Sequence, residues 1–220
     1  MKSNESLQKD VQDAIKWEPL LNAAEIGVTV KDGIVTLTGT VDSYAKKMEA
    51  EDAAKNVLGV NGVVEQIEIK FPNNWSKSNS AIAIEVIDAL AANWAVPKDK
   101  VKVKVEDGWV TLEGEVHWNY QKEAAKKTIH TLAGVKGVMN YIIIKPDSQD
   151  EVEKAGIELA LLRNWSIDDK QIAVDVEGNN VTLNGNVNSI FQKTEAERIA
   201  WNAPGVWSVT NNLMIEYDVL

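Results

Sequence analysis

The stretch Asp32-Gly-Ile-Val-Thr-Leu-Thr-Gly-Thr-Val41 decides the fold, because close copies of it occur twice more in the chain. The copies are Asp107-Gly-Trp-Val-Thr-Leu-Glu-Gly-Glu-Val116 and Gly178-Asn-Asn-Val-Thr-Leu-Asn-Gly-Asn-Val187. In each copy the inner glycine (Gly39, Gly114, Gly185) is followed 20 positions later by another glycine (Gly59, Gly134, Gly205). A spacing that never changes identifies three tandem copies of one unit.

The apolar residues of each copy predict the same order of elements. A first helix is indicated by apolar residues four positions apart: Val11 and Ile15, Val86 and Leu90, Ile157 and Leu161. In each copy a strand of alternating apolar and polar residues follows, around Val28, Val103 or Val174. After a turn comes a second such strand, around Val35, Val110 or Val181, so the two strands predict a β-hairpin. The alanine-containing segments 45–58, 120–133 and 191–203 predict a second helix that ends at the second glycine as its C′ residue. A last alternation, through Ile67, Ile142 and Leu213, predicts a third strand.

The expected fold is therefore α+β, with three tandem α-β-β-α-β modules. Each module should hold a three-stranded mixed sheet with two helices on one face, which leaves the other face open. We place the modules at residues 1–72, 78–146 and 148–220, because the segments 71–80 and 145–150 are rich in Pro, Ser and Asn. Val35, Val110 and Val181 should be buried at equivalent positions.

Composition restricts the environment and the partners of the chain. The chain has a net charge of −10 and no cysteine, so we expect no nucleic-acid partner, no disulfide and no thiolate chemistry. No apolar run is long enough for a transmembrane segment, and the start Met-Lys-Ser-Asn-Glu-Ser does not resemble a secretory signal. The expected location is cytoplasmic for the sequence as written, and periplasmic if it is a mature form.

The hairpin signature and the ending Gly-Val-x-x-Val at 59–63 resemble the BON domain family. All three copies carry the central Val-Thr-Leu-x-Gly-x-Val, and the threefold arrangement is similar to the OsmY-related members of that family. Copy three departs from the pattern at Asn179 and Ser208, where the others have glycine. The resemblance implies association with osmotic or envelope stress and binding to phospholipid or to other proteins, with no catalytic residues.

The residues themselves also argue against an enzyme or a metal site. The histidines, His117 and His130, fall on different predicted elements, so we expect no metal and no organic cofactor. The acidic group Asp147, Asp150, Glu151 and Glu153 lacks the spacing of a calcium loop. Ser148 and Glu151 instead have the spacing of a capping box before the first helix of copy three.

Three tryptophans occupy positions that are polar in the other copies, namely Trp118, Trp201 and Trp207. Contact between neighbouring copies explains them, and so does a surface for a ligand or partner. Trp94 and Trp165 are expected in core or edge packing instead.

Charge singles out the middle copy, since the three copies carry −4, +2 and −8. Lys100, Lys102 and Lys104 alternate with inward valines and should lie on the open face of the sheet together with Trp109. Trp118 and Tyr120 are expected nearby. This candidate surface fits two functions, contact with phospholipid or envelope components and a protein–protein scaffold or chaperone-like factor.

Overall fold

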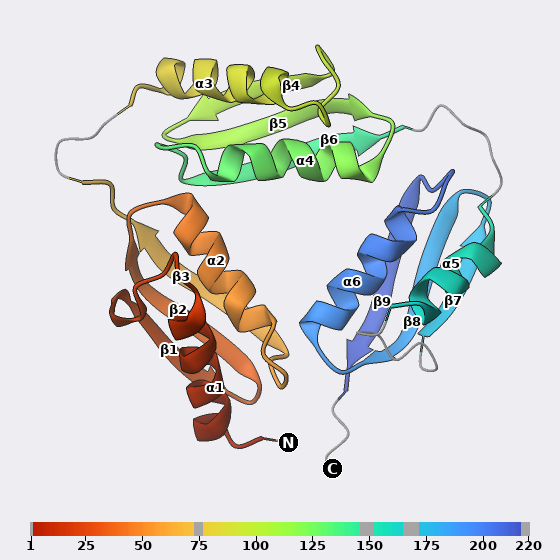
Figure 1. Cartoon of the computed structure of the whole chain (residues 1–220), viewed down its shortest axis with the longest axis horizontal. Coiled ribbons are helices and arrows are strands. Elements are labelled where there is room, and N and C mark those ends of the chain that lie inside the picture. The colour runs from red at the N-terminus through yellow and green to blue at the C-terminus, as the bar shows by residue number, and fades with distance from the viewer. Residues whose placement is uncertain (1, 73–76, 146–151, 165–171, 217–220) are drawn as a thin grey trace.

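The computed structural model describes residues 2–72, 77–145, 152–164 and 172–216, and it contains three modules of the expected element order (Figure 1). Module 1 comprises α1 (Asn4–Trp17), the short 3₁₀ helix η1 (Ala23–Glu25), β1 (Ile26–Lys31), β2 (Ile34–Val41), α2 (Tyr44–Lys55) and β3 (Gly62–Ile69). Module 2 comprises α3 (Asn79–Ala92), β4 (Val101–Glu106), β5 (Trp109–Val116), α4 (Asn119–His130) and β6 (Gly137–Ile144). Module 3 comprises α5 (Lys154–Leu162), β7 (Ile172–Glu177), β8 (Asn180–Val187), α6 (Ile190–Trp201) and β9 (Ser208–Ile215).

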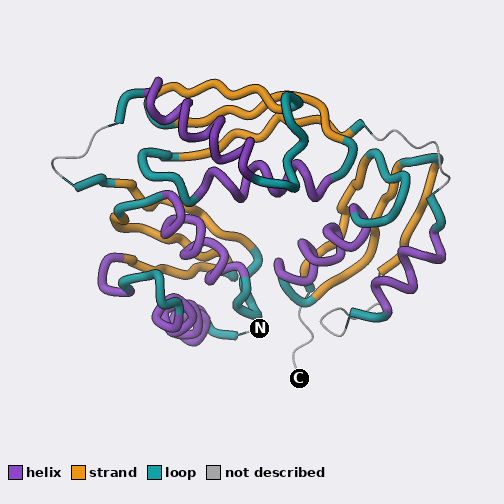
Figure 2. The backbone as a smooth tube through the Cα atoms, turned by 45° about the horizontal axis from the view of Figure 1, so that its top comes forward, coloured by secondary structure: helices purple, strands orange, loops and turns teal. Residues whose placement is uncertain are grey.

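Each module folds its strands into one mixed sheet. The orders are β1-β2-β3, β4-β5-β6 and β7-β8-β9, with the first pair antiparallel and the second pair parallel. The middle strand is the second strand of the hairpin, which places the repeated signature at the centre of every sheet. The two helices of a module cover one face of its sheet (Figure 2), so the α+β prediction is confirmed.

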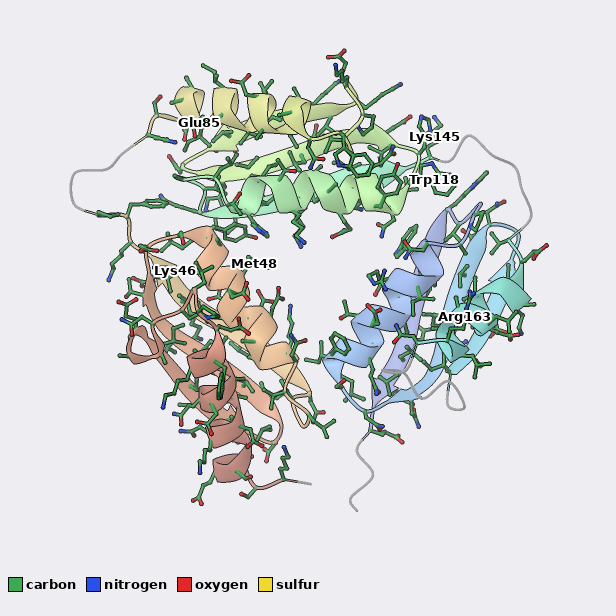
Figure 3. All side chains as sticks on the ribbon, in the orientation of Figure 1. Lys46, Met48, Glu85, Trp118, Lys145 and Arg163 are labelled. Atoms are coloured by element: carbon green, nitrogen blue, oxygen red, sulfur yellow. The ribbon has the colours of Figure 1, made fainter. Side chains whose placement is uncertain are left out.

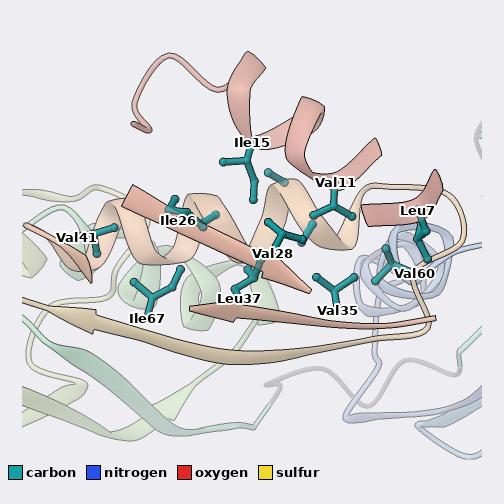
Figure 4. Close-up of a cluster of buried hydrophobic side chains, with 13 residues drawn as sticks. Leu7, Val11, Ile15, Ile26, Val28, Val35, Leu37, Val41, Val60 and Ile67 are labelled. Atoms are coloured by element: carbon teal, nitrogen blue, oxygen red, sulfur yellow. The ribbon is translucent and has the colours of Figure 1, made fainter. Parts of the chain in front are cut away.

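The core of each module lies between the helices and the inward face of the sheet. Val35, Val110 and Val181 have no exposed surface, as expected from their equivalent positions in the repeat. Figure 4 shows this core in module 1, where Val11 and Ile15 of α1 face Val28 and Leu37 of the hairpin. Burial of aliphatic side chains stabilises each module by roughly 1.5–3 kcal/mol per side chain.

The inner glycine of the signature is required by close contact between strand backbones. Gly39 has a φ of +126° and Gly114 a φ of +142°, a region that side chains other than hydrogen rarely enter. A Cβ atom on Gly39 would lie 2.0 Å from the carbonyl oxygen of Glu25, and one on Gly114 would lie 2.0 Å from that of Lys100. The signature glycine therefore lets the hairpin begin at the correct register.

The second glycine serves a turn rather than the helix end that we expected. The second helices end at Lys55, His130 and Trp201, four residues before Gly59, Gly134 and Gly205. The C′ prediction was wrong because a further turn follows each helix and buries Val60, Val135 or Val206. Gly59 takes a φ of +112° in that turn, where a Cβ would also approach Leu7 to 3.1 Å.

The capping box that the sequence predicts before α5 falls on residues that the structure does not describe. The helix begins at Lys154 after the N-cap residue Glu153, whose side chain makes no capping hydrogen bond. Ser148 and Glu151 lie outside the described residues. Val152, the first described residue of module 3, is buried in its core.

Modules 1 and 2 are joined by an aromatic side chain. Tyr44, the first residue of α2, is only 8% exposed and belongs to the hydrophobic core of module 2, where Met48 and Ile69 also pack (Figure 3 labels Met48). Burial raises the pKa of Tyr44 above its ordinary value. The first turn of α2 thus contributes to the core of the neighbouring module.

Ile190 repeats this contact between modules 3 and 1. It is the first residue of α6, the position of Tyr44 in the repeat, and it packs against the core of module 1. The second helices α2, α4 and α6 lie on the inner side of the arrangement in both ribbon views (Figures 1 and 2). Equivalent residues thus make head-to-tail contacts of the kind that close rings of repeated units.

A pair of carboxyl groups weakens module 1 at neutral pH. The pKa of Glu49 is raised, first by burial and then by the charge of Glu18 and a hydrogen bond to it. In module 3 the same two positions hold Asn164 and Glu195, and the Asn164 Nδ2 donates to Glu195 Oε1 at 2.8 Å. Module 3 has therefore replaced a repulsive pair by a hydrogen bond.

We expect Glu18→Asn to stabilise the protein at pH 7 by about 0.5 kcal/mol, a small gain because the pair is partly exposed to solvent. A raised carboxyl pKa means that the folded state holds its proton more tightly than the unfolded state. The contribution of Glu49 to the stability of the natural protein therefore falls as pH rises above the unfolded value of about 4.3. Urea unfolding of both proteins should show the gain at pH 7 and lose it towards pH 4. A gain that is equal at both pH values would contradict the carboxyl-pair explanation.

Candidate interaction surface of the middle module

The open face of the module 2 sheet carries two of the three expected lysines. Lys102 and Lys104 are exposed and alternate with the partly buried Val101, Val103 and Val105. Lys100 is also exposed and directly precedes β4. The alternation of β4 places Lys102 and Lys104 outward, as the sequence predicts, whereas Lys100 lies just outside the strand.

Trp109 lies on the same face at the start of β5. Its side chain is 47% exposed, and its ring lies over Gly137 of β6, the residue paired with it in the sheet. A Cβ atom on Gly137 would collide with the ring, so the absence of a side chain at this position allows the indole to pack against the β6 backbone. The indole is therefore held flat against the sheet while one side remains available for contact.

Glutamates on the same face cancel the charge of the lysines. Lys102 is paired in register with Glu113, and Lys104 lies 3.0 Å from Glu106 in an ion pair. At the end of the sheet the Lys145 ammonium lies 3.2 Å from Glu115 (Figure 3 labels Lys145). The open face is therefore close to neutral, which the alternation of β4 alone could not reveal.

The edge strand β6 adds an apolar row that sequence reasoning missed. Met139, Tyr141 and Ile143 point away from the helices and are 38%, 62% and 61% exposed. The equivalent residues are Val64, Gln66 and Glu68 in module 1 and Thr210, Asn212 and Met214 in module 3. Comparison of the repeats at these positions would have revealed the row. We name Trp109, Met139, Tyr141 and Ile143 the apolar row.

Trp118 and Tyr120 do not join this surface. Trp118 is the N-cap residue of α4 and Tyr120 lies in its first turn, so both belong to the helix layer (Figure 3 labels Trp118). They are 38% and 48% exposed. The six candidate contact residues are thus divided: Lys102, Lys104 and Trp109 lie on the open face, Lys100 lies just before β4, and Trp118 and Tyr120 belong to the helix layer.

The remaining tryptophans lie in different surroundings. Trp201 ends α6 and is partly buried against the core of module 3, whereas Trp207 is 47% exposed beside β9. Trp94 is 90% exposed, so the prediction of core or edge packing was wrong: after the end of α3 at Ala92, the neighbouring Ala95 and Val96 are buried instead. Trp165 lies outside the described residues.

The parts of the chain that the structure describes hold no cluster of three or more histidine, aspartate or glutamate side chains that could bind a metal. Among the same residues, no helix is both long and apolar enough to cross a membrane. His117 and His130 lie on separate elements. Burial is the largest cause of the lowered pKa of His130, and the neighbouring Lys127 acts in the same direction.

Comparison with protein families identifies the repeated module. The model of the BON domain matches residues 3–70, 78–146 and 149–217, which is most of the chain. The chain belongs to the BON domain family. The signature glycines and the hairpin around them are therefore features of BON modules in this chain.

Two curated relatives match about half of this BON protein. Osmotically-inducible protein Y of Escherichia coli (strain K12) is 32% identical over 129 residues, which cover 57% of this chain and 64% of the relative. The match thus spans less than two thirds of that relative. An uncharacterized protein in the gshII 5' region of Anaplasma centrale is 28% identical over 125 residues, covering 56% of this chain and 83% of its own length.

The chain is also similar to a solved structure, at low sequence identity. The C-terminal domain of CdsD, a structural protein of the type III secretion system of Chlamydia trachomatis, is 14% identical over 98% of this chain and all of its own. Its TM-score is 0.26.

Proposed function

We propose that this protein is a non-enzymatic binding protein of the osmotic or envelope stress response, and that the open face of module 2 contacts phospholipid surfaces. Its three BON domains and its similarity to osmotically-inducible protein Y support the general assignment. The apolar row supports the location of the contact, because exposed apolar groups gather on one of three otherwise equivalent faces.

The chemistry of the open face fits the interfacial region of a bilayer. Trp109 and Tyr141 are the side-chain types that favour the boundary between headgroups and acyl chains. Met139 and Ile143 extend the apolar row along β6, and Lys102 and Lys104 lie on the opposite edge of the same sheet. Because the glutamates balance the lysines, apolar contact rather than charge should provide most of the binding free energy.

A protein partner is the second candidate, and the same charge balance favours it. Aromatic and methionine side chains with paired charges around them are typical of protein interfaces. The net charge of −10 also opposes approach to an anionic membrane over most of the surface. In this case the protein would act as a scaffold or chaperone-like factor.

Co-sedimentation of the whole protein with vesicles distinguishes the candidates. One set of vesicles is pure phosphatidylcholine and the other an equimolar mixture with phosphatidylglycerol. The double variant Met139→Thr/Tyr141→Asn gives module 2 the residues of module 3, so it should fold while binding both vesicles at least about tenfold more weakly. The matched variant Lys102→Ala/Lys104→Asp also carries module 3 residues, and it should weaken binding only to the anionic vesicles, by about 1 kcal/mol per lysine.

Absence of binding to both kinds of vesicle would overturn the lipid assignment in favour of a protein partner. Loss of all binding in the lysine variant, with the apolar variant unaffected, would contradict the role of the apolar row. Circular dichroism of the variants establishes that each of them is folded.

A further inference from the structure

A groove with a volume of about 520 Å³ lies between α5 and α6 in module 3. It belongs to the helix layer and is therefore separate from the open faces of the sheets. Among the residues that line it are Ile157, Ala160, Ile199, Ala203, Glu153 and Arg163. The volume lies within the range of roughly 300–1,000 Å³ that is usual for small-molecule sites.

The repeat explains why module 3 has this groove. At the position of Glu153, module 1 has Leu7 and module 2 has Ile82, which are 2% and 3% exposed in their cores. At the position of Ala203 they have Val57 and Leu132, which pack against the same cores. Module 3 thus lacks two large apolar side chains that fill this place in the other modules.

The loss of these two side chains leaves apolar surface of α5 and α6 uncovered along the groove, which an apolar ligand would bury. Val152 enters the core of module 3 and compensates for part of the lost volume, yet the groove remains. The apolar floor along α5 and α6 favours an alkyl chain over a polar metabolite, because a buried polar group without a partner is costly.

The two charged residues lie at opposite ends of α5. Glu153 and Arg163 are ten residues apart, which corresponds to about 15 Å along a helix. The Arg163 Nε donates to the backbone oxygen of Leu159 at 3.1 Å, and this bond uses one of the five donors of the guanidinium (Figure 3 labels Arg163). A guanidinium binds carboxylates through paired hydrogen bonds, so Arg163 can hold one carboxylate at its end of the groove.

We propose that this groove binds a single-chain fatty acid, with the carboxylate at Arg163 and the alkyl chain between α5 and α6. Glu153 repels a second carboxylate at the far end of the groove. The site therefore selects a monocarboxylate over a dicarboxylate of the same length. This binding is independent of the proposed contact through module 2.

Calorimetric titration of the whole protein with dodecanoate below its micellar concentration tests the proposal. Dodecanoate should bind at least tenfold more tightly than dodecanedioate or dodecyltrimethylammonium. Arg163→Gln should reduce the affinity for dodecanoate at least tenfold, and Arg163→Lys should restore part of it. Ala203→Leu, which introduces the residue of module 2, should abolish binding and raise the thermal midpoint.

Two results would overturn the proposal. One is that dodecanoate does not bind, and the other is that it binds Ala203→Leu as tightly as the natural protein. If Ala203→Leu does not fold, Ala203→Val supplies the residue of module 1 and should weaken binding in the same direction. Vesicle binding by Ala203→Leu should remain unchanged, so failure of this site is distinguishable from failure of the module 2 contact.

Discussion

Gly114→Ala is expected to destabilise module 2 by about 3 kcal/mol or more. Gly114 has a φ of +142°, where residues other than glycine are strained, and the new Cβ would lie 2.0 Å from the carbonyl oxygen of Lys100. Relief of this overlap requires β4 and β5 to separate, at a cost of about 3 kcal/mol or more. A module of about 70 residues has a total stability of roughly 3.5–10 kcal/mol, at about 0.05–0.15 kcal/mol per residue, so this cost removes a large part of it. Circular dichroism should therefore show that about one third of the ordered structure melts at a clearly lower temperature than in the natural protein.

Gly178 provides the control, because it also has a positive φ but an added Cβ atom would not collide with any neighbouring atom. Gly178 has a φ of +60°, and a Cβ there would meet nothing within 4 Å. Its equivalents Asp32 and Asp107 already have φ values of 51° and 49°. Gly178→Asp should therefore cost about 1 kcal/mol or less. If both variants are equally stable, backbone proximity does not explain the signature glycine.

Tyr44→Ala should release module 1 from module 2. The ring is 8% exposed within the core of module 2, and truncation of a buried aromatic side chain usually costs about 3–5 kcal/mol. The linkage between the modules should be lost while both sheets persist. Small-angle X-ray scattering should therefore report a larger radius of gyration with nearly unchanged circular dichroism.

Tyr120→Ala is the matched control for this experiment. Tyr120 lies in the first turn of α4, as Tyr44 does in α2, but it is 48% exposed. Its removal should leave the scattering unchanged. An unchanged radius in Tyr44→Ala would show that the aromatic contact does not hold the modules together.

The fold was predictable because the same local pattern of apolar and polar residues occurs in each of the three modules. Alternation in the hairpin and the apolar pairs of the first helix determine which residues are buried, and Val35, Val110 and Val181 are buried accordingly. The second helix was predicted too long. A glycine shortly after a helix is typical of a C′ residue, but it is also found in a separate turn such as the one that buries the valine here, and the sequence does not distinguish the two.

The candidate surface was only partly predictable, since it depends on pairing between strands. The lysines of β4 were visible as an alternating pattern, but the glutamates that balance them lie on β5 and meet them only through the sheet register. The apolar row of β6 was visible only by comparing the repeats position by position, because within β6 Tyr141 and Ile143 alternate with the apolar Ile142 and Ile144. The groove in module 3 depends on α5 packing against α6, which local sequence does not specify.

A single fluorescent label provides the most direct measurement of the proposed contact. The chain has no cysteine, so Thr111→Cys creates one unique attachment site for an environment-sensitive dye on the open face of module 2, beside Met139 and outside the apolar row. Thr182→Cys places the same dye at the equivalent position of module 3. On addition of phosphatidylcholine vesicles, the emission should shift to shorter wavelength for the label at 111 and remain constant for the label at 182. Equal shifts at both positions, or no shift at 111, would contradict the account.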